Sequence, residues 1–280
     1  IAMVWDLDDP FWYPATKQAY RTAKILNFDI TVFAPKGRGE AGTLEMVHFL
    51  KKVLEERYDG ICISPIADLR VEKLLQKMAE KGVEVIFILS AFDSVPYRTL
   101  IGTDSYQCGR STGEAVREAL GADGAVGIIK WKDNLIETVE DRYHGVVDVL
   151  KENRIPYYDM TGPGEPTAEE ATKLTDRLLT EHPDISVLCA TNVGWGLAFA
   201  RYLKSKGKKV KLVTVDFTDE VGEFMKAGYV DAAIAQRPES WGSMTLEKIE
   251  AVFEGQSIPK TIDTGTYPVT PANIRIYVKD

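Results

Sequence analysis

The sequence opens with IAMVWDLDDPFW (residues 1–12), an apolar run that ends on a cluster of acidic and aromatic residues. The run Ile1–Trp5 has the length of a buried strand, and the amphipathic pattern that follows it predicts a helix. Strand-like runs of this kind lie near 1–5, 29–34, 60–64, 84–89, 125–129, 186–190, 211–215 and 231–235. Helical periodicity follows near 12–27, 43–57, 68–82, 105–120, 138–153, 167–181, 194–206, 219–227 and 239–254. Strands that alternate with helices predict an α/β fold of parallel sheets with right-handed βαβ connections.

The alternation is interrupted once, at residues 90–104, which contain Ser94, Pro96 and Gly102. Two short runs, Thr261–Asp263 and Ile274–Val278, close the chain outside the alternation. Two sheets with several chain crossings fit this pattern better than one large sheet.

Polar and aromatic residues recur where the predicted strands end. The clusters are Asp8-Asp9-Pro10-Phe11-Trp12, Thr103-Asp104-Ser105, Asp141-Arg142, Thr191-Asn192, Val215-Asp216 and Ala235-Gln236-Arg237-Pro238. In open α/β sheets, ligands bind outside the carboxyl ends of the strands. We therefore expect one polar ligand that is held by many loops.

The composition is that of a globular chain, with 280 residues, 45% hydrophobic residues and a net charge of −8. This length suffices for two domains with ordinary cores. The acidic balance disfavours nucleic acids and anionic membrane surfaces as partners. The sequence contains neither a charged leader nor an apolar run long enough to span a membrane.

Enzymatic signatures are weak. The sequence lacks the motifs H-E-x-x-H, C-x-x-C and G-x-S-x-G, and its three histidines are not at metal-ligand spacing. We predict no enzyme, no metal and no cofactor. Residues 37–42 match the dinucleotide pattern G-x-G-x-x-G, but Pro35-Lys36 separate them from the preceding strand, so this alternative is weak. Cys62, Cys108 and Cys189 are predicted to be structural thiols.

Taken in order, the strand-end clusters resemble those of the type I periplasmic sugar-binding proteins, together with Gly60-Ile61-Cys62-Ile63-Ser64-Pro65 and Asp141-Arg142-Tyr143-His144-Gly145. The resemblance covers the whole chain. It implies two similar doubly wound parallel-sheet lobes, joined by a three-crossing hinge, that close around a ligand. The amino-terminal lobe would comprise 1–103 plus 237–263, and the carboxyl-terminal lobe 104–236 plus 264–280.

The resemblance also implies roles for individual residues. Asp9 would accept a hydrogen bond from a sugar hydroxyl, and Phe11 and Trp12 would pack against the apolar faces of the sugar ring. The alternatives are a helix N-cap for Asp9 and ordinary core positions for the two aromatic residues.

In the carboxyl-terminal lobe, Arg142 would bridge neighbouring hydroxyls, and Asn192, Asp216 and Gln236 would each serve a hydroxyl. The alternative for Arg142 is an ion pair with Asp141 or Glu140. For the strand-end amide and carboxylate residues, the alternative is turn chemistry.

Several positions depart from the family pattern. Leu89-Ser90 stand where many sugar binders have a polar residue followed by arginine, Pro166 replaces an expected aromatic residue, and Val193 replaces a frequent acid. Ser90, Asp104 and Trp131 complete the predicted ligand-binding set, with Trp131 favoured over Trp5, Trp195 and Trp241 as a substitute aromatic. Lys130 and Lys132 flank Trp131, which leaves an anionic sugar acid open as a ligand.

We therefore predict an extracytoplasmic solute-binding protein, in the periplasm or at the cell surface as a lipoprotein, that delivers a monosaccharide to an ABC-transporter permease. A pentose, a deoxysugar or a polyol would suit the altered lining. The alternatives are a ligand-sensing subunit for a membrane histidine kinase and the effector domain of a lactose-repressor-type regulator.

Overall fold

The computed structural model describes residues 1–6, 8, 10–37, 39–121, 123–131, 137–163 and 166–277. The chain divides into two compact units. Unit 1 comprises Ile1–Thr103 and Arg237–Thr264, and unit 2 comprises Asp104–Gln236 and Gly265–Asp280. The chain therefore passes from one unit to the other three times.

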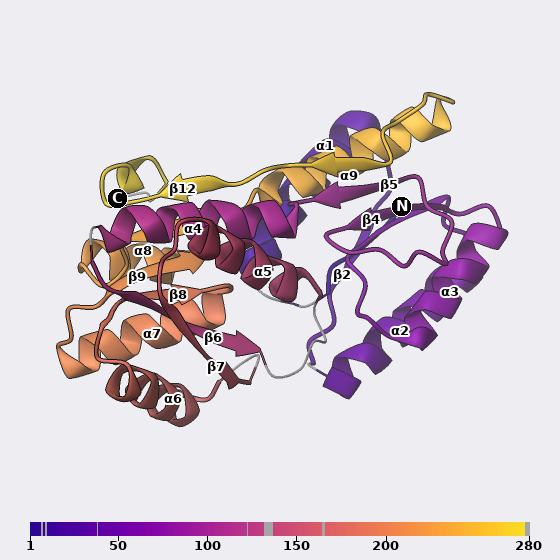
Figure 1. Ribbon diagram of the computed structural model, residues 1–280. Helices are drawn as coiled ribbons and strands as arrows, with labels where there is room; N and C mark the ends of the chain where they lie inside the picture. The colour runs from indigo at the N-terminus through magenta and orange to yellow at the C-terminus, as the bar shows by residue number, and fades with distance from the viewer. Residues whose placement is uncertain are drawn as a thin grey trace. The chain divides into compact units, whose positions relative to one another are not determined.

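Unit 1 is built on a parallel sheet with the strand order β11-β5-β4-β3-β1-β2 (Figure 1). Its strands are β1 (Ala2–Val4), β2 (Thr31–Phe33), β3 (Gly60–Ile63), β4 (Glu84–Ile88), β5 (Thr99–Gly102) and β11 (Thr261–Asp263). Its helices are the 3-10 helix Pro10–Trp12, α1 (Tyr13–Leu26), α2 (Gly39–Glu55), α3 (Leu69–Glu80) and α9 (Pro238–Phe253). Helices α2 and α3 pack on one face of the sheet around Leu50 and Leu75, and α1 and α9 pack on the other face around Ala19 and Trp241.

Unit 2 repeats this plan with the strand order β12-β10-β9-β8-β6-β7, in which β12 is antiparallel to β10. Its strands are β6 (Ala125–Trp131), β7 (Tyr157–Gly162), β8 (Ile185–Ala190), β9 (Lys211–Val215), β10 (Ala232–Ala235) and β12 (Tyr267–Val269). Its helices are α4 (Ser105–Leu120), α5 (Glu137–Glu152), α6 (Ala168–Glu181), α7 (Val193–Lys206), α8 (Asp219–Lys226) and the 3-10 helix Ile274–Ile276. The prediction of two doubly wound parallel-sheet units is confirmed.

The structure corrects the predicted element list at several places. Strand β5 lies inside the segment 90–104 that was predicted to interrupt the alternation, and strands β7 and β12 were not predicted. The strand β7 lies at a sheet edge and is only partly buried, so it lacks the continuous apolar run of a central strand. Of the two closing runs, Thr261–Asp263 forms β11, whereas Ile274–Ile276 forms a 3-10 helix.

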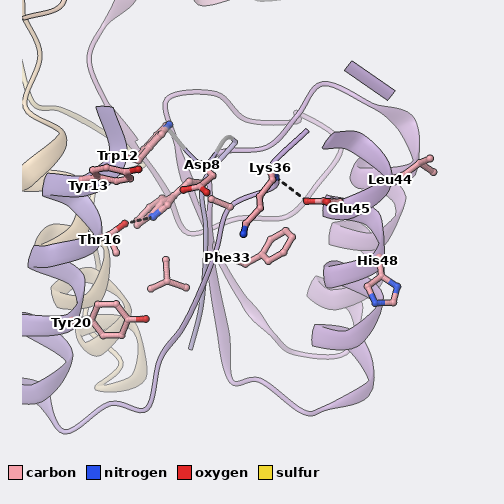
Figure 2. Close-up of a pocket in the computed structure, with 13 residues that line it drawn as sticks. Asp8, Trp12, Tyr13, Thr16, Tyr20, Phe33, Lys36, Leu44, Glu45 and His48 are labelled. Carbon is pink, nitrogen blue, oxygen red and sulfur yellow. Dashed lines mark hydrogen bonds between the residues drawn. The ribbon is translucent and has the colours of Figure 1, made fainter. Parts of the chain in front are cut away.

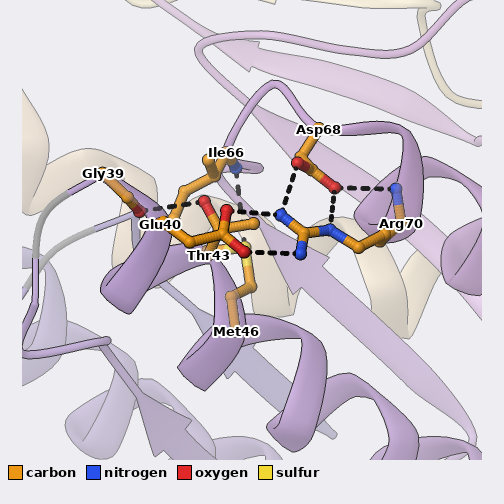
Figure 3. Close-up of polar contacts among 7 residues, drawn as sticks. All are labelled: Gly39, Glu40, Thr43, Met46, Ile66, Asp68 and Arg70. Carbon is orange, nitrogen blue, oxygen red and sulfur yellow. Dashed lines mark hydrogen bonds and ion pairs between the residues drawn. The ribbon is translucent and has the colours of Figure 1, made fainter.

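A polar network ties the beginnings of α2 and α3 together in unit 1 (Figure 3). Arg70 donates two hydrogen bonds of 2.8 Å to the carboxylate of Glu40 at the start of α2. It also donates to the carboxylate of Asp68, the residue that caps α3. The hydrogen bonds from Arg70 lower the pKa of both carboxyl groups. Bidentate geometry of this kind fixes orientation, although exposed ion pairs add little to stability.

Glycines allow one very close helix pair in each unit. In unit 2, a Cβ atom on Gly109 of α4 would overlap the carbonyl oxygen of Arg142, and a Cβ atom on Gly145 of α5 would overlap that of Tyr106. In unit 1, a Cβ atom on Gly242 of α9 would overlap the carbonyl oxygen of Ala15 in α1. A side chain at any of these positions would force the two helices apart.

We predict that Gly145→Ala lowers the free energy of unfolding by about 1–3 kcal/mol, the usual cost of overpacking a close contact. Urea denaturation followed by circular dichroism measures this change. The matched control is Gly194→Ala at the start of α7, where an added Cβ atom would have no neighbour closer than 3.8 Å. Equal denaturation midpoints for the two variants would contradict the close packing of α4 and α5.

Candidate functional site

The carboxyl ends of neighbouring strands in unit 2 carry buried polar residues. Thr191 follows β8, Asp216 follows β9, Gln236 follows β10, and Arg142 extends from α5. Each is less than a tenth exposed, and Arg142 is 5% exposed. Gln236 donates a 2.7 Å hydrogen bond to Asp216, and Arg142 donates a 3.4 Å hydrogen bond to the carbonyl oxygen of Thr191. Thr191, Asp216 and Gln236 thus lie at strand ends, as the strand-end pattern predicts, whereas Asp141 and Arg142, which were also predicted at a strand end, lie within α5 because strand β6 ends earlier, at Trp131. We call the four buried residues Arg142, Thr191, Asp216 and Gln236 the polar cluster of unit 2.

Some polar atoms of this cluster are buried without a partner. Within the described residues, the Nε atom of Arg142, the Oε1 atom of Gln236 and the indole Nε1 atom of Trp131 make no hydrogen bond. A buried donor or acceptor that stays unpaired costs about 1–3 kcal/mol, so such atoms need an explanation. Two donors and one acceptor are therefore available in unit 2 to a ligand that brings hydroxyl groups.

Three charged side chains of unit 2 act on the pKa of the Cys108 thiol. Burial raises the pKa of Cys108 to about 11, the charge of Arg142 acts to lower it, and the charges of Asp216 and Asp104 act to raise it. Asp104, Arg142 and Asp216 therefore all lie within electrostatic reach of one buried atom.

The alternative roles predicted for the unit 2 residues were an ion pair for Arg142 and turn chemistry for residues such as Asn192. In the described part of the chain, no ion pair joins Arg142 to Asp141 or Glu140. Glu140 instead lies 3.9 Å from Lys130 and 3.7 Å from His144. Asn192 does cap a helix, since its Oδ1 atom accepts a 2.9 Å hydrogen bond from the backbone of Trp195.

Asp104 caps a helix in the same way. Its Oδ1 atom accepts a 2.9 Å hydrogen bond from the backbone of Gln107 at the start of α4, and its side chain is otherwise exposed. Each cap uses one side-chain oxygen atom of the residue that forms it. Capping a helix is therefore compatible with a second role for both residues.

In unit 1, the predicted aromatic residues belong to one cluster. Trp12 is 4% exposed and stacks on Trp5 with ring centroids 5.2 Å apart. Phe11 is less buried and packs edge-on against Trp12 at 5.4 Å, with Trp241 at 5.7 Å. Phe11 therefore offers the more accessible ring, whereas Trp12 is mainly part of the core. Asp9 lies outside the described residues.

The end of β4 has an unusual backbone. Leu89 has a φ of +65°, a left-handed conformation that a leucine rarely adopts. The half-buried Ser90 follows, and its backbone nitrogen donates a 2.8 Å hydrogen bond to the carbonyl oxygen of Ile88. Ser90 is thus turned sharply out of the strand direction.

The structure separates the tryptophans considered as substitute aromatic groups. Trp5, Trp195 and Trp241 are at most 1% exposed, and Trp195 donates a 2.9 Å hydrogen bond to the carbonyl oxygen of Pro163. Trp131 is only half-buried, at the end of β6. Of these four residues, Trp131 has the most exposed ring.

The two lysines beside Trp131 do not strengthen the case for an acidic ligand. The ammonium group of Lys130 lies 3.9 Å from Glu140 and 5.0 Å from the centre of the Tyr143 ring. Its charge is therefore already partly balanced within unit 2. Lys132 lies outside the described residues.

Three hydroxyl residues were not in the predicted ligand set. Thr191 supplies the carbonyl oxygen that accepts from Arg142. Thr103 and Ser105 bury hydroxyl groups that have no hydrogen-bond partner among the described residues. All three are next to a predicted strand-end residue in the sequence, and this position is the signal that could have added them to the ligand set.

The described residues contain neither a metal-binding group of side chains nor a membrane-spanning helix. No group of three or more histidine, cysteine, aspartate or glutamate side chains is arranged to hold a metal ion. None of the helices within the described ranges has both the length and the apolar character needed to cross a membrane.

We predict that the three cysteine thiols of the folded protein react very slowly with Ellman's reagent at pH 8. All three are buried, and burial raises the pKa of Cys62 and Cys189 to about 12 and that of Cys108 to about 11. The thiolate is the reactive form, so both its scarcity and its inaccessibility slow the reaction. Unfolding in guanidinium chloride should release three thiols per chain, and rapid reaction of the folded protein would contradict the burial.

The chain matches a known protein family over most of its length. The sequence profile of the family described as "Periplasmic binding protein domain" matches residues 1–257. The ribose import binding protein of Haemophilus influenzae is 25% identical over 264 residues, which cover 91% of this chain and 86% of that protein. The ribose import binding protein of Bacillus subtilis is 20% identical over 263 residues, which cover 91% and 82%.

Solved structures show the same fold. An ABC-transporter solute-binding protein from Burkholderia graminis, solved in complex with D-arabinose, has a TM-score of 0.87 at 23% identity and covers 99% of this chain and 97% of that one. A sugar-binding protein of a sugar ABC transporter from Bacillus halodurans has a TM-score of 0.88 at 18% identity, with 99% of each chain covered. The resemblance seen in the strand-end clusters is confirmed, and the chain belongs to the periplasmic binding protein family, whose members bind substrates and are not enzymes.

Proposed function

We propose that this protein binds a monosaccharide and delivers it to an ABC-transporter permease. The observation that carries the proposal is the buried polar cluster of unit 2, in which Arg142 and Gln236 keep unpaired polar atoms beside Asp216. A sugar ring carries hydroxyl groups that both donate and accept, so it can satisfy the guanidinium nitrogen and the amide oxygen together.

Arg142 would be the central group for ligand binding. Its planar guanidinium has five donors, and the single 3.4 Å hydrogen bond to Thr191 uses only one of them. Asp216 would accept from a second hydroxyl, and the hydrogen bond from Gln236 already orients its carboxylate. Asn192 and Asp104 would add a donor and an acceptor at the edge of the cluster.

The predicted residues of unit 1 would supply mainly apolar contacts to a sugar. Phe11 would present its ring to the C–H face of the sugar, with Trp12 packed edge-on against that ring. Asp9 and Ser90 would provide the polar contacts. Since Leu89 and Ser90 replace a stronger polar pair, we assign a sugar with an apolar edge, such as a pentose or a deoxysugar.

We assign uptake rather than sensing because the curated relatives are import binding proteins. An extracytoplasmic location, in the periplasm or at the cell surface, goes with this assignment. The partner would be the membrane permease of the transporter.

We predict that Arg142→Ala lowers ligand affinity by at least about 2 kcal/mol, or roughly thirty-fold, because hydrogen bonds to charged groups are worth about 1.5–3 kcal/mol. Isothermal titration calorimetry with the cognate sugar measures the loss. Arg142→Lys should recover only part of it, since an ammonium group cannot reproduce bidentate geometry.

The matched control is Arg201→Ala. Arg201 is an exposed arginine of α7 that pairs with the exposed Glu220 of α8 and with none of the predicted ligand-binding residues in the described part of the chain. Circular dichroism should first establish that each variant is folded. Unchanged affinity in a folded Arg142→Ala variant would refute the role of this residue.

We predict that the cognate sugar changes the tryptophan fluorescence of the protein and that Trp131→Phe removes most of this change. Trp131 is half-buried and its indole nitrogen is unpaired, so a bound hydroxyl would alter its surroundings directly. Trp195→Phe is the control, because Trp195 is 1% exposed and its indole nitrogen is already bonded. A spectrum that responds equally in both variants would exclude Trp131 from the site.

A thermal-shift screen of pentoses, hexoses, deoxysugars, polyols and sugar acids identifies the ligand. A compound that binds only the folded protein stabilises it by about 2.7 kcal/mol at a hundred times its dissociation constant. Stabilisation by a sugar supports the proposal. A screen in which no sugar raises the melting temperature would overturn it.

A further inference from the structure

A groove lies beside the edge strand β2 of unit 1, between helices α1 and α2 (Figure 2). Its volume is about 790 Å³. Small-molecule sites commonly have about 300–1,000 Å³, so this groove is at the larger end of that range. All of its lining residues belong to unit 1.

Exposed apolar groups line both walls. Tyr13 and Tyr20 lie seven residues apart on one face of α1 and are 58% and 54% exposed. Opposite them, Leu44 of α2 is 51% exposed, and the half-buried Phe33 of β2 is held by stacking on Phe49 at 4.3 Å. Large exposed side chains that gather in a concave surface, rather than singly, indicate a binding surface.

Charged groups of both signs face the same space. Figure 2 shows the side chains of Asp8, Lys36 and Glu45 at the groove, with the backbone nitrogen of Lys36 donating a 2.9 Å hydrogen bond to Glu45. Within the described residues, the ammonium group of Lys36 forms no ion pair. Lys36 disfavours a cationic ligand, and the two carboxylates disfavour an anionic one, so the groove suits a neutral ligand with many hydroxyl groups.

The edge strand adds backbone groups to this surface. In β2, Thr31 donates to Ile1 and Phe33 accepts from Trp5, so the residues on either side of Val32 are directed toward β1. The N–H and C=O groups of Val32 point the other way, toward the open edge of the sheet.

The second wall of the groove is held in place. The hydrogen bonds from Arg70 fix Glu40 at the start of α2, one turn before Leu44 and Glu45 (Figure 3). On the first wall, Thr16 of α1 accepts a 2.8 Å hydrogen bond from the indole of Trp5. Hydrogen bonds within unit 1 thus hold a residue on each wall, and a preorganised surface lowers the entropic cost of binding.

We propose that this groove is a second ligand site, for a neutral oligosaccharide of two or three sugar rings. The tyrosine rings stack on the C–H faces of the sugars, and the carboxylates, the ammonium group and the Val32 backbone bond to their hydroxyls. Trp12 lines the groove and also supports Phe11 in the proposed monosaccharide site, so Tyr20 and Leu44, which have no part in the proposed monosaccharide site, distinguish the two sites.

The probes for a test are maltotriose, cellotriose and xylotriose, titrated into protein labelled with 5-fluorotryptophan. The chain has five tryptophans, and Trp5 and Trp12 line the groove, so their ¹⁹F resonances, assigned by single Trp→Phe substitutions, should shift on binding. Tyr20→Ala should weaken binding about tenfold through loss of one stacking surface. Leu44→Arg should abolish binding by filling the groove.

Leu69→Arg is the matched control, because Leu69 is 60% exposed on α3 and does not line the groove. Trisaccharide binding should also survive Arg142→Ala, or Arg142→Lys if the alanine variant does not fold. Monosaccharide affinity should be unchanged in Tyr20→Ala. These two results distinguish the groove from the unit 2 cluster.

Three outcomes overturn the proposal. One is that none of the three trisaccharides shifts the Trp5 or Trp12 resonance. Another is that Leu44→Arg and Leu69→Arg bind a trisaccharide equally well. The third is a dimer, detected by analytical ultracentrifugation, that Leu44→Arg converts to a monomer, which would make the groove an interface between copies of the chain.

Discussion

The binding chemistry of unit 2 depends on the contact between α4 and α5. Because Gly109 and Gly145 have no side chains, the backbone of Arg142 lies directly against α4. From there its guanidinium is buried and donates to the carbonyl oxygen of Thr191 after β8, although Arg142 itself belongs to no strand. A buried cation needs polar partners, and the strand ends provide them. The packing of α4 against α5 thus determines that the guanidinium of Arg142 lies at the carboxyl edge of the sheet.

The two units use the same plan with different chemistry. Their strand orders correspond one to one, so β1 matches β6, β4 matches β9 and β5 matches β10. At these equivalent ends, unit 2 has Trp131, Asp216 and Gln236, whereas unit 1 has the Trp5–Trp12 stack, Leu89 and Thr103. The hydrogen-bonding groups in unit 2 suit a hydroxylated ligand, whereas the aromatic surface in unit 1 suits an apolar face.

Local signals made much of this structure predictable, and long-range contacts explain what was not. Central strands such as β3 and β8 are buried on both faces and read as unbroken apolar runs, whereas the edge strand β7 does not. The burial of Gln236 at a strand end agrees with its position in the sequence, and its role in binding stays a prediction. The sequence left open whether Trp12 is a core residue, because its burial depends on Trp5 and Trp241, and α9 returns to unit 1 only after residues 104–236.

The backbone conformation at Leu89 supports the prediction that the neighbouring Ser90 contacts a ligand. Leu89 after β4 and Asp216 after β9 occupy equivalent places, with φ angles of +65° and +68°. Aspartate tolerates the left-handed region through local hydrogen bonds, but a leucine gains no such compensation, and the conformation costs it roughly 1–2 kcal/mol. Packing holds it there, because Gly102 lies directly beside Leu89. Unit 1 therefore keeps the backbone turn although the polar side chain is missing, and such retained strain is typical of positions that serve a ligand.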